Sequence, residues 1–185
     1  MFDRFDLRSI FRAQWRSLSY FGDRGADGTR AVHPDIVARV VLLAVPIAVC
    51  GAMWIFDGVL RNATVFLTAS TLFSAVLLGV FAQLASLRSR FTADEPTPQD
   101  QDQRDVLDES VNHVMAAEIG AIAASILLAV GLGTSGSSTI CGPLAWVVSG
   151  TLAYVAVVIL MLLPNLLYAY TRTNNVDSAL SGFGR

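Results

Sequence analysis

One carboxylate stands inside a long apolar window of this sequence. Glu118 lies among alanines, isoleucines and glycines in the window 113–132. An ionisable side chain within a membrane span is costly unless it is paired or hydrated. Arg39 lies at a similar depth in the window 36–56, so an Arg39–Glu118 ion pair is the structural interpretation. The functional interpretation is an acid that lines a water-filled path and selects cations or binds a proton.

Hydroxyl side chains form a second polar feature. They fall within one arc of about 160° on a helix built from the uncharged window 63–87. These residues are Thr64, Thr68, Ser70, Thr71 and Ser74. Such a stripe is typical of hydrogen bonds between packed helices, and equally of a pore lining, so both interpretations stay open.

The fourth apolar window, 144–170, carries its own polar residue near the end. Asn165 follows Pro164 directly. A proline within a helix frees a backbone carbonyl and kinks the chain. We expect the Asn165 side chain to satisfy that carbonyl.

The sequence lacks the patterns of known enzyme chemistry. It contains no nucleophile elbow, H-E-x-x-H zinc motif, phosphate loop or dinucleotide fingerprint. Its two histidines and its two cysteines, Cys50 and Cys141, have no metal-ligand spacing. We therefore expect no enzyme activity, no cofactor and no metal site. The net charge of −2 gives no reason to expect nucleic acid as a partner.

The four windows are the elements that must position these residues. Each can cross the ~30 Å hydrocarbon core as a helix. They comprise residues 36–56, 63–87, 113–132 and 144–170. Charged residues make up 15% of the chain, against about 25% in soluble domains. The sequence predicts an all-α integral membrane protein, with four transmembrane helices in two hairpins and an N-terminal amphipathic interfacial helix.

The arginines predict the orientation. All 13 basic residues are Arg, a composition typical of a high-GC bacterial genome. Twelve lie on one side of the predicted membrane, and Arg61 alone lies on the other. The positive-inside rule then places the arm 1–35, the loop after the second span and the tail 171–185 in the cytoplasm. We expect a multi-pass protein of the bacterial inner membrane with both termini inside.

Residues Met1–Phe21 are predicted to form the interfacial helix. Trp15 lies among arginines that recur at every fourth position, namely Arg4, Arg8, Arg12 and Arg16. This pattern suits a helix in the headgroup layer that is held by anionic lipid. It either anchors the topology or binds a regulatory partner. Gly22–Val32 is expected to be a loop, and Pro34 to lie in the first turn of the next helix.

Two connecting segments carry further expectations. Thr97–Asp100 resembles a helix cap with Pro98 at the first position, so the third helix should begin near residue 98 and protrude into the cytoplasm. The acidic residues there form either a solvated face or a docking surface for the N-terminal helix or a basic partner. The loop Gly131–Pro143 is either a flexible connector or a re-entrant segment.

Small residues recur at every fourth position in the third and fourth windows. They are Ala116, Gly120 and Ala124, followed by Ala145, Ser149 and Ala153. This pattern lets helices approach closely. It predicts that the third helix is the most enclosed, and that copies of the chain form a homo-oligomer around the second or third helix.

Conduction is the function that these features favour. We expect a small homo-oligomeric channel or pore-forming effector, gated by a cytoplasmic protein, a small ligand or another cytoplasmic signal. One alternative is a non-conducting anchor or scaffold subunit. Another is half of a transporter, because Pro46 and Pro164 interrupt the first and fourth windows in corresponding ways.

Overall fold

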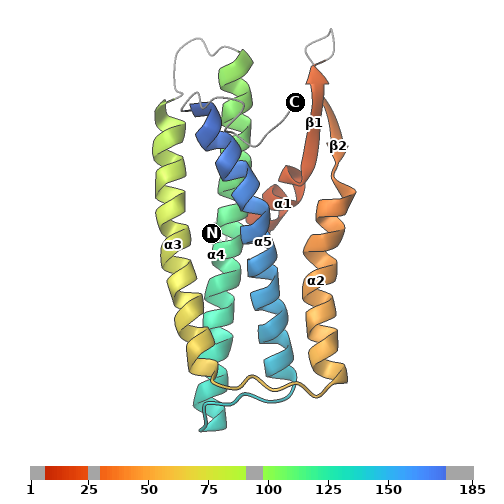
Figure 1. Cartoon of the computed structure of the whole chain (residues 1–185), viewed down its shortest axis with the longest axis vertical. Coiled ribbons are helices and arrows are strands. Elements are labelled where there is room, and N and C mark those ends of the chain that lie inside the picture. Colours follow the sequence, from red (N-terminus) through yellow and green to blue (C-terminus); the bar gives the residue numbers. More distant parts are fainter. Residues whose placement is uncertain (1–6, 25–29, 91–97, 174–185) are drawn as a thin grey trace, which may run out of the picture.

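The computed structural model describes residues 7–24, 30–90 and 98–173 of the chain. The described elements are α1 (Leu7–Ser17), β1 (Ser19–Arg24), β2 (Arg30–Pro34), α2 (Ile36–Ile55), α3 (Ala63–Arg90), α4 (Pro98–Ser135) and α5 (Pro143–Thr173) (Figure 1). Arg4, the acids Asp94 and Glu95, Thr97 and the tail 174–185 lie outside the described residues, and so do the expectations placed on them.

Four of the described helices are long and apolar enough to cross a membrane. These are α2, α3, α4 and α5, and the short helix α1 precedes them. The predicted helical membrane fold, four long apolar helices with a short N-terminal helix, is confirmed. α4 begins at Pro98, the position that the capping pattern predicts, and runs without interruption to Ser135.

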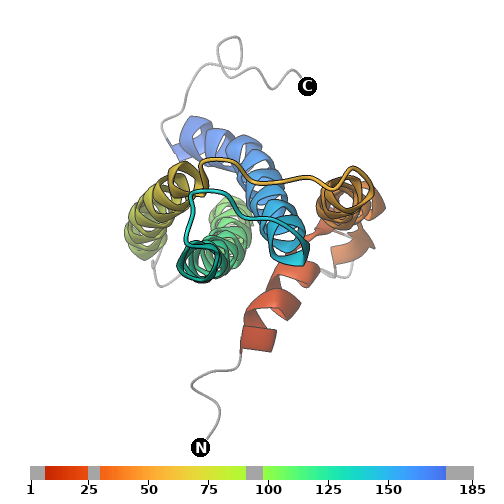
Figure 2. The same cartoon turned by 90° about the horizontal axis from the view of Figure 1, so that it is seen from below.

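The four long helices stand in one row, in the order α3, α4, α5, α2. α4 packs against α3 on one side and α5 on the other, and α5 in turn packs against α2. Seen along the helices, α2 and α3 occupy opposite edges of the row (Figure 2). The predicted hairpin of the last two spans is therefore present, whereas the first two spans are separated by the other pair.

The loops at one end of the row explain how α2 and α3 come to be apart. The loop 56–62 crosses this end and pairs with the loop 136–142 through an antiparallel bridge between Leu60 and Ile140 (Figure 1). Leu60 N donates to Ile140 O at 2.9 Å, and Ile140 N donates to Leu60 O at 3.0 Å. We call this end the two-loop end, and the opposite one, beside β1 and β2, the hairpin end.

The glycine-rich connection after α4 is shorter than the sequence suggests. Gly131 and Gly133 are helical, because α4 continues to Ser135. The remaining loop is held against its neighbour by the Leu60–Ile140 bridge and by a 2.8 Å bond from Ala63 N to Ser138 O. The loop thus runs across the two-loop end and does not turn back between the helices.

The small residues of α4 face its two neighbours. Half of the apolar section of α4 is buried, against 33% for α5, 11% for α3 and 6% for α2. Ala116, Ala117 and Ala124 are fully buried. At Gly120 an added Cβ would lie 2.8 Å from Val155 Cγ2. The prediction that the third span is the most enclosed is confirmed, and these residues serve packing within one chain.

A similar close approach joins α2 to α5. At Gly150 an added Cβ would lie 3.2 Å from both the Pro46 carbonyl oxygen and Cys50 Cβ. Ala145 is buried, and Ser149 Oγ donates to the Ala145 carbonyl at 2.8 Å. Gly150 and Ala145 therefore lie at contacts of α5 with the rest of the chain, whereas the Ser149 hydroxyl bonds its own helix.

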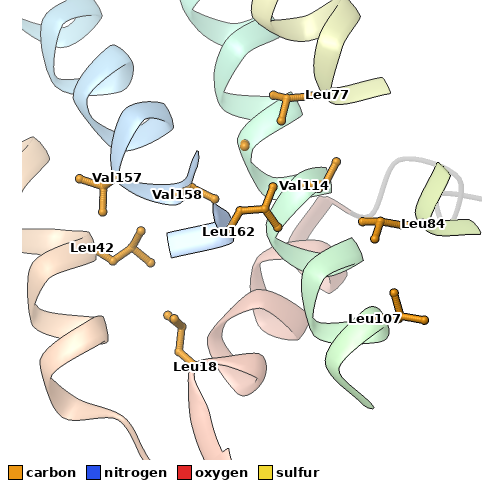
Figure 3. Close-up of a cluster of buried hydrophobic side chains, with 10 residues drawn as sticks. Leu18, Leu42, Leu77, Leu84, Leu107, Val114, Val157, Val158 and Leu162 are labelled. Carbon is orange, nitrogen blue, oxygen red and sulfur yellow. The ribbon is translucent and has the colours of Figure 1, made fainter. Parts of the chain in front are cut away.

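Two apolar clusters fill the row. The one toward the hairpin end joins Leu18, Leu42 of α2, and residues of the other long helices (Figure 3). Its remaining buried members are Leu77, Leu84, Leu107, Val114, Ala117, Val157, Val158 and Leu162. The other cluster, toward the two-loop end, contains Leu60, Ala63, Leu128, Ile140, Ala145 and Val148.

The N-terminal segment differs from its prediction. The helix ends at Ser17, and β1 and β2 form an antiparallel pair in which Ser19 lies opposite Pro34. Asp35 is the N-cap of α2, and its side chain accepts a hydrogen bond from Ala38 N at 3.1 Å. Because Asp35 satisfies an exposed N–H of the first turn, the helix begins at Ile36. Pro34 therefore ends a strand, where its missing N–H costs little.

The close approach of α4 and α5 at Gly120 gives a stability test. Gly120→Leu should lower the free energy of unfolding by about 2–3 kcal/mol, because its Cβ overlaps Val155 and crowds the Tyr154 ring. Gly79→Leu is the control, since nothing lies within 4 Å of a Cβ at Gly79. Unfolding in mild detergent with added SDS measures both, and equal losses would contradict the packing role.

Candidate membrane-embedded acid site

Glu118 lies in the contact between α3 and α4, which we call the α3–α4 seam. Its side chain is buried, with 5% of its residue surface exposed. Ser74 Oγ of α3 donates a hydrogen bond to Glu118 Oε1. The second oxygen, Oε2, is buried and has no hydrogen-bond partner in the part of the chain that the structure describes. The site is therefore a half-satisfied carboxyl group between two candidate spans.

The depth of Glu118 follows from its partner. Ser74 is the twelfth residue of α3, which begins at Ala63 beside the two-loop end. At 1.5 Å per residue, Ser74 lies about 16 Å from that end, close to the middle of a hydrocarbon core of about 30 Å. The window 113–132 by itself would place Glu118, its sixth residue, nearer the hairpin end. The structure places it deeper, because α4 continues past this window to Ser135 at the two-loop end.

Arg39 has partners other than Glu118. Its Nε donates to the Leu18 carbonyl at 3.2 Å, and a terminal nitrogen donates to the Trp15 carbonyl at 3.1 Å. Its guanidinium carbon lies 5.0 Å from the centroid of the Trp15 ring. A cation at the C-terminal carbonyls of a helix is favourable. Arg39 thus caps α1.

The geometry of the row explains why the predicted ion-pair residues lie apart. Arg39 belongs to α2 at one edge, whereas Glu118 is bonded to α3 at the other edge. α5 packs between α2 and α4 (Figure 2). Two residues at equal depth in different spans need not be neighbours.

The hydroxyl stripe of α3 divides into two sets. Ser70 Oγ donates to the Ala121 carbonyl of α4 at 2.9 Å, so Ser70 and Ser74 both join α3 to α4. Thr64, Thr68 and Thr71 are exposed. The hydroxyls of Thr68 and Thr71 bond carbonyls of their own helix at 2.9–3.1 Å. The serines thus serve packing, and the threonines face outward.

A second polar group, absent from the sequence interpretation, joins α4 to α5. Glu109 Oε1 accepts a hydrogen bond from Asn165 Nδ2 at 3.1 Å and lies 3.6 Å from His113 Nε2. His113 is 2% exposed. The i, i+4 spacing of Glu109 and His113 could have been noticed in the sequence. The expectation for Asn165 was wrong, because its side chain bonds Glu109 of α4 and not the carbonyl that Pro164 frees.

α1 packs against the row of long helices through a face that includes the polar residue Gln14. Gln14 is buried, and its Oε1 accepts a hydrogen bond from the hydroxyl of Tyr154 on α5 at 2.8 Å. The exposed surface of α1 carries both large apolar residues and the predicted arginines. These residues are Leu7, Phe11 and Trp15, with Arg8, Arg12 and Arg16 beside them. α1 is therefore a helix packed on the bundle, with its arginine flank outward.

The bond between Ser74 and Glu118 can be tested by a mutant cycle. Ser74→Ala should lower the free energy of unfolding by about 1–2 kcal/mol, because it removes the hydrogen bond that Glu118 accepts from Ser74. In a Glu118→Leu background the same change should cost about 1 kcal/mol less. Thr71→Ala, at an exposed site, should stay within about 0.5 kcal/mol. Identical losses in both backgrounds would exclude the contact.

The cap on α1 gives a local test. Arg39→Gln should speed amide hydrogen exchange in Trp15–Leu18 about fivefold, since a charged C-terminal cap contributes about 1 kcal/mol. Hydrogen-exchange mass spectrometry on protein in nanodiscs measures this effect. Arg61→Gln, in the loop 56–62, is the control and should leave the exchange unchanged. Unaltered exchange in Arg39→Gln would show that α1 is held by other contacts.

The chemistry available at the site is that of a single buried carboxyl group. Across residues 7–24, 30–90 and 98–173, no three His, Cys, Asp or Glu side chains gather as a metal-binding group. A carboxyl group with a free oxygen binds a proton or interacts with a passing cation.

Comparison of the chain with protein-family models, with curated proteins and with solved structures finds no match.

Proposed function

We propose that this protein is a small homo-oligomeric membrane channel that conducts cations along the α3–α4 seam. The observation that carries the proposal is Glu118, a buried carboxyl group near the middle of a candidate span with one unpartnered oxygen. An acid at that depth is costly and marks ion or proton pathways in membrane proteins. An apolar residue of similar volume would fill the seam at lower cost.

The polar groups of the seam support this path. Arg88 Nε and Asp108 Oδ1 form an ion pair of 3.0 Å at the hairpin end of α3 and α4. Deeper along the same contact lie the Ser74–Glu118 bond and the bond from Ser70 to the Ala121 carbonyl. These polar groups lie at the hairpin end of the seam and near its middle, and the buried side chains of Leu77, Leu84 and Val114 lie between them.

The position of α3 provides a way to open the seam. α3 is an edge helix whose extensive packing is with α4 (Figure 2). A small outward movement of α3 would expose Ser70, Ser74 and Glu118 to water. In this structure the seam is packed closed, so conduction requires α3 to move outward at least transiently.

The arrangement of the four long helices in a single row favours an assembly of more than one copy of the chain. Four helices side by side enclose no path within one chain, because α2 and α3 stand at open edges. A second copy against the α3 edge would shield an opened seam from lipid. The exposed hydroxyl-bearing residues Thr64, Thr68 and Thr71 lie on this edge helix.

The arginines support an orientation for this channel. Arg39 and Arg88 lie toward the hairpin end, as does α1 with its exposed arginines, whereas Arg61 lies in the loop 56–62 at the other end. The positive-inside rule then puts the hairpin end in the cytoplasm of a bacterial inner membrane. A cytoplasmic regulator would act on α1 and the β1–β2 hairpin.

A non-conducting membrane anchor is the second candidate. Two observations favour it: Ser70 and Ser74 are already engaged between the helices, and an apolar cluster around Leu128 and Val148 fills the two-loop end. In that case α1 and the hairpin would be the docking elements for a partner. Flux measurements separate the two candidates.

Conductance in planar bilayers tests the channel. The purified full-length protein should give currents whose reversal potential in a salt gradient indicates cations over anions. Glu118→Gln keeps an acceptor for Ser74 but removes the charge, and should reduce the current at least tenfold.

The matched control is Asp57→Asn, an exposed acid of the loop 56–62 whose φ of 49° asparagine also adopts. Its current should equal that of the wild type. A wild type that carries no current under voltage, with intact folding, would reject the channel and favour the anchor.

A further inference from the structure

Two neighbouring faces of α1 are exposed. The first is apolar, and at 100° per residue it covers an arc of about 80°. It consists of Leu7, Phe11 and Trp15, and we call it the apolar stripe. The second covers the next arc of about 80°. It consists of Arg8, Arg12 and Arg16, and we call it the arginine face.

The buried face of α1 lies toward the long helices. Gln14 and Ser17 are its buried residues, and Arg12 lies about 160° round the helix from Gln14. The arginine face therefore points away from the row. α1 contains no acidic residue. An apolar stripe beside a basic face is the pattern of a helix that lies in the surface of an anionic bilayer.

The contacts of α1 fix its depth along the row. Arg39 donates to the carbonyls of Trp15 and Leu18 and precedes Ile55, the last residue of α2, by 16 positions. At 1.5 Å per residue, this end of α1 lies about 24 Å from the two-loop end. Tyr154, which bonds Gln14, lies deeper, about 16 Å from the same end along α5.

These distances place α1 within the membrane boundary. A hydrocarbon core that begins at the two-loop end extends for about 30 Å, so the Arg39 contact lies about 6 Å inside its far side. Interfacial helices lie at a depth of about 5–10 Å. Figure 1 shows α1 beside the first turns of α2, and Figure 2 shows that it extends sideways from the row, with Leu7 at its outer end. At this depth the exposed faces of α1 meet lipid rather than a soluble protein.

We propose that α1 is a binding site for anionic lipid in the leaflet at the hairpin end. The apolar stripe lies among the acyl chains, and the arginine face binds lipid phosphates, to which guanidinium groups donate paired hydrogen bonds. The Trp15 ring, 5.0 Å from the guanidinium carbon of Arg39, lies at the level where tryptophan is enriched in membrane proteins. The inference goes beyond conduction, since a channel and a non-conducting anchor would both carry such a helix.

Amide hydrogen exchange tests the preference for anionic lipid. Full-length protein is placed in nanodiscs of phosphatidylcholine alone, or of an equal mixture of phosphatidylcholine and phosphatidylglycerol. The anionic lipid should slow exchange in Leu7–Ser17 by at least about twentyfold, because each arginine near an anionic surface strengthens binding by up to about fivefold. The double variant R12Q/R16Q should reduce this ratio to about fivefold or less.

The ratio between the two lipids is a readout that a loss of helix stability alone would not change. Arg61→Gln is the matched control, since it removes a positive charge at the two-loop end and should keep the wild-type ratio. Equal exchange of the wild type in both nanodiscs would overturn the lipid site, and a wild-type ratio in R12Q/R16Q would overturn the role of the arginine face. If unfolding in SDS shows that the double variant does not fold, Arg12→Gln decides, with an expected fall of about fivefold.

Tryptophan fluorescence tests the depth of α1. Trp54→Phe and Trp146→Phe together leave Trp15 as the one tryptophan of the chain. Its fluorescence should be quenched more strongly by lipid brominated just below the headgroup than by lipid brominated near the chain end. Quenching by aqueous acrylamide, with none by either brominated lipid, would place α1 in water and overturn the site.

Discussion

The lack of side-chain bulk on α4 is the constraint on which the rest of the structure depends. Ala117 and Ala121 are buried, and Ser70 of α3 reaches the Ala121 carbonyl. Gly120 and Ala124 are also buried, and the contacts at Gly120 come from Val155 and Tyr154 of α5. In lipid, where apolar surfaces gain little by meeting each other, close backbone approach and hydrogen bonds are what hold helices together.

The same close packing sets the chemistry of Glu118. A carboxyl group between two tightly packed helices exchanges its water for a few fixed partners, and here the described part of the chain supplies one hydroxyl for two oxygens. An incompletely satisfied buried group costs more than a satisfied or an apolar one. The α3–α4 seam therefore combines close helix packing with a half-satisfied buried carboxyl group. This combination is the physical basis of the proposed path.

Near the hairpin end, α1 forms contacts with two helices of the row. Arg39 binds carbonyls at the end of α1, and Tyr154 of α5 donates to Gln14. α1 is thus connected to an edge helix and to an inner helix of the row. A movement of α1 would therefore act on both α2 and α5.

The sequence alone was enough to predict the four long helices, the start of α4 at Pro98 and the enclosure of the third span. These follow from local properties: apolar length, the proline cap and the spacing of small residues. It identified Glu118 as the exceptional acid and Ser74 among the candidate polar residues. Which of these polar residues are in contact could be seen only in the folded chain. Depth along a helix is readable from residue counting, but helix neighbours are set by loops and by surfaces far apart in the chain. The Leu60–Ile140 bridge and the small face of α4 separate α2 from α3, so Arg39 caps α1 and Glu118 bonds Ser74.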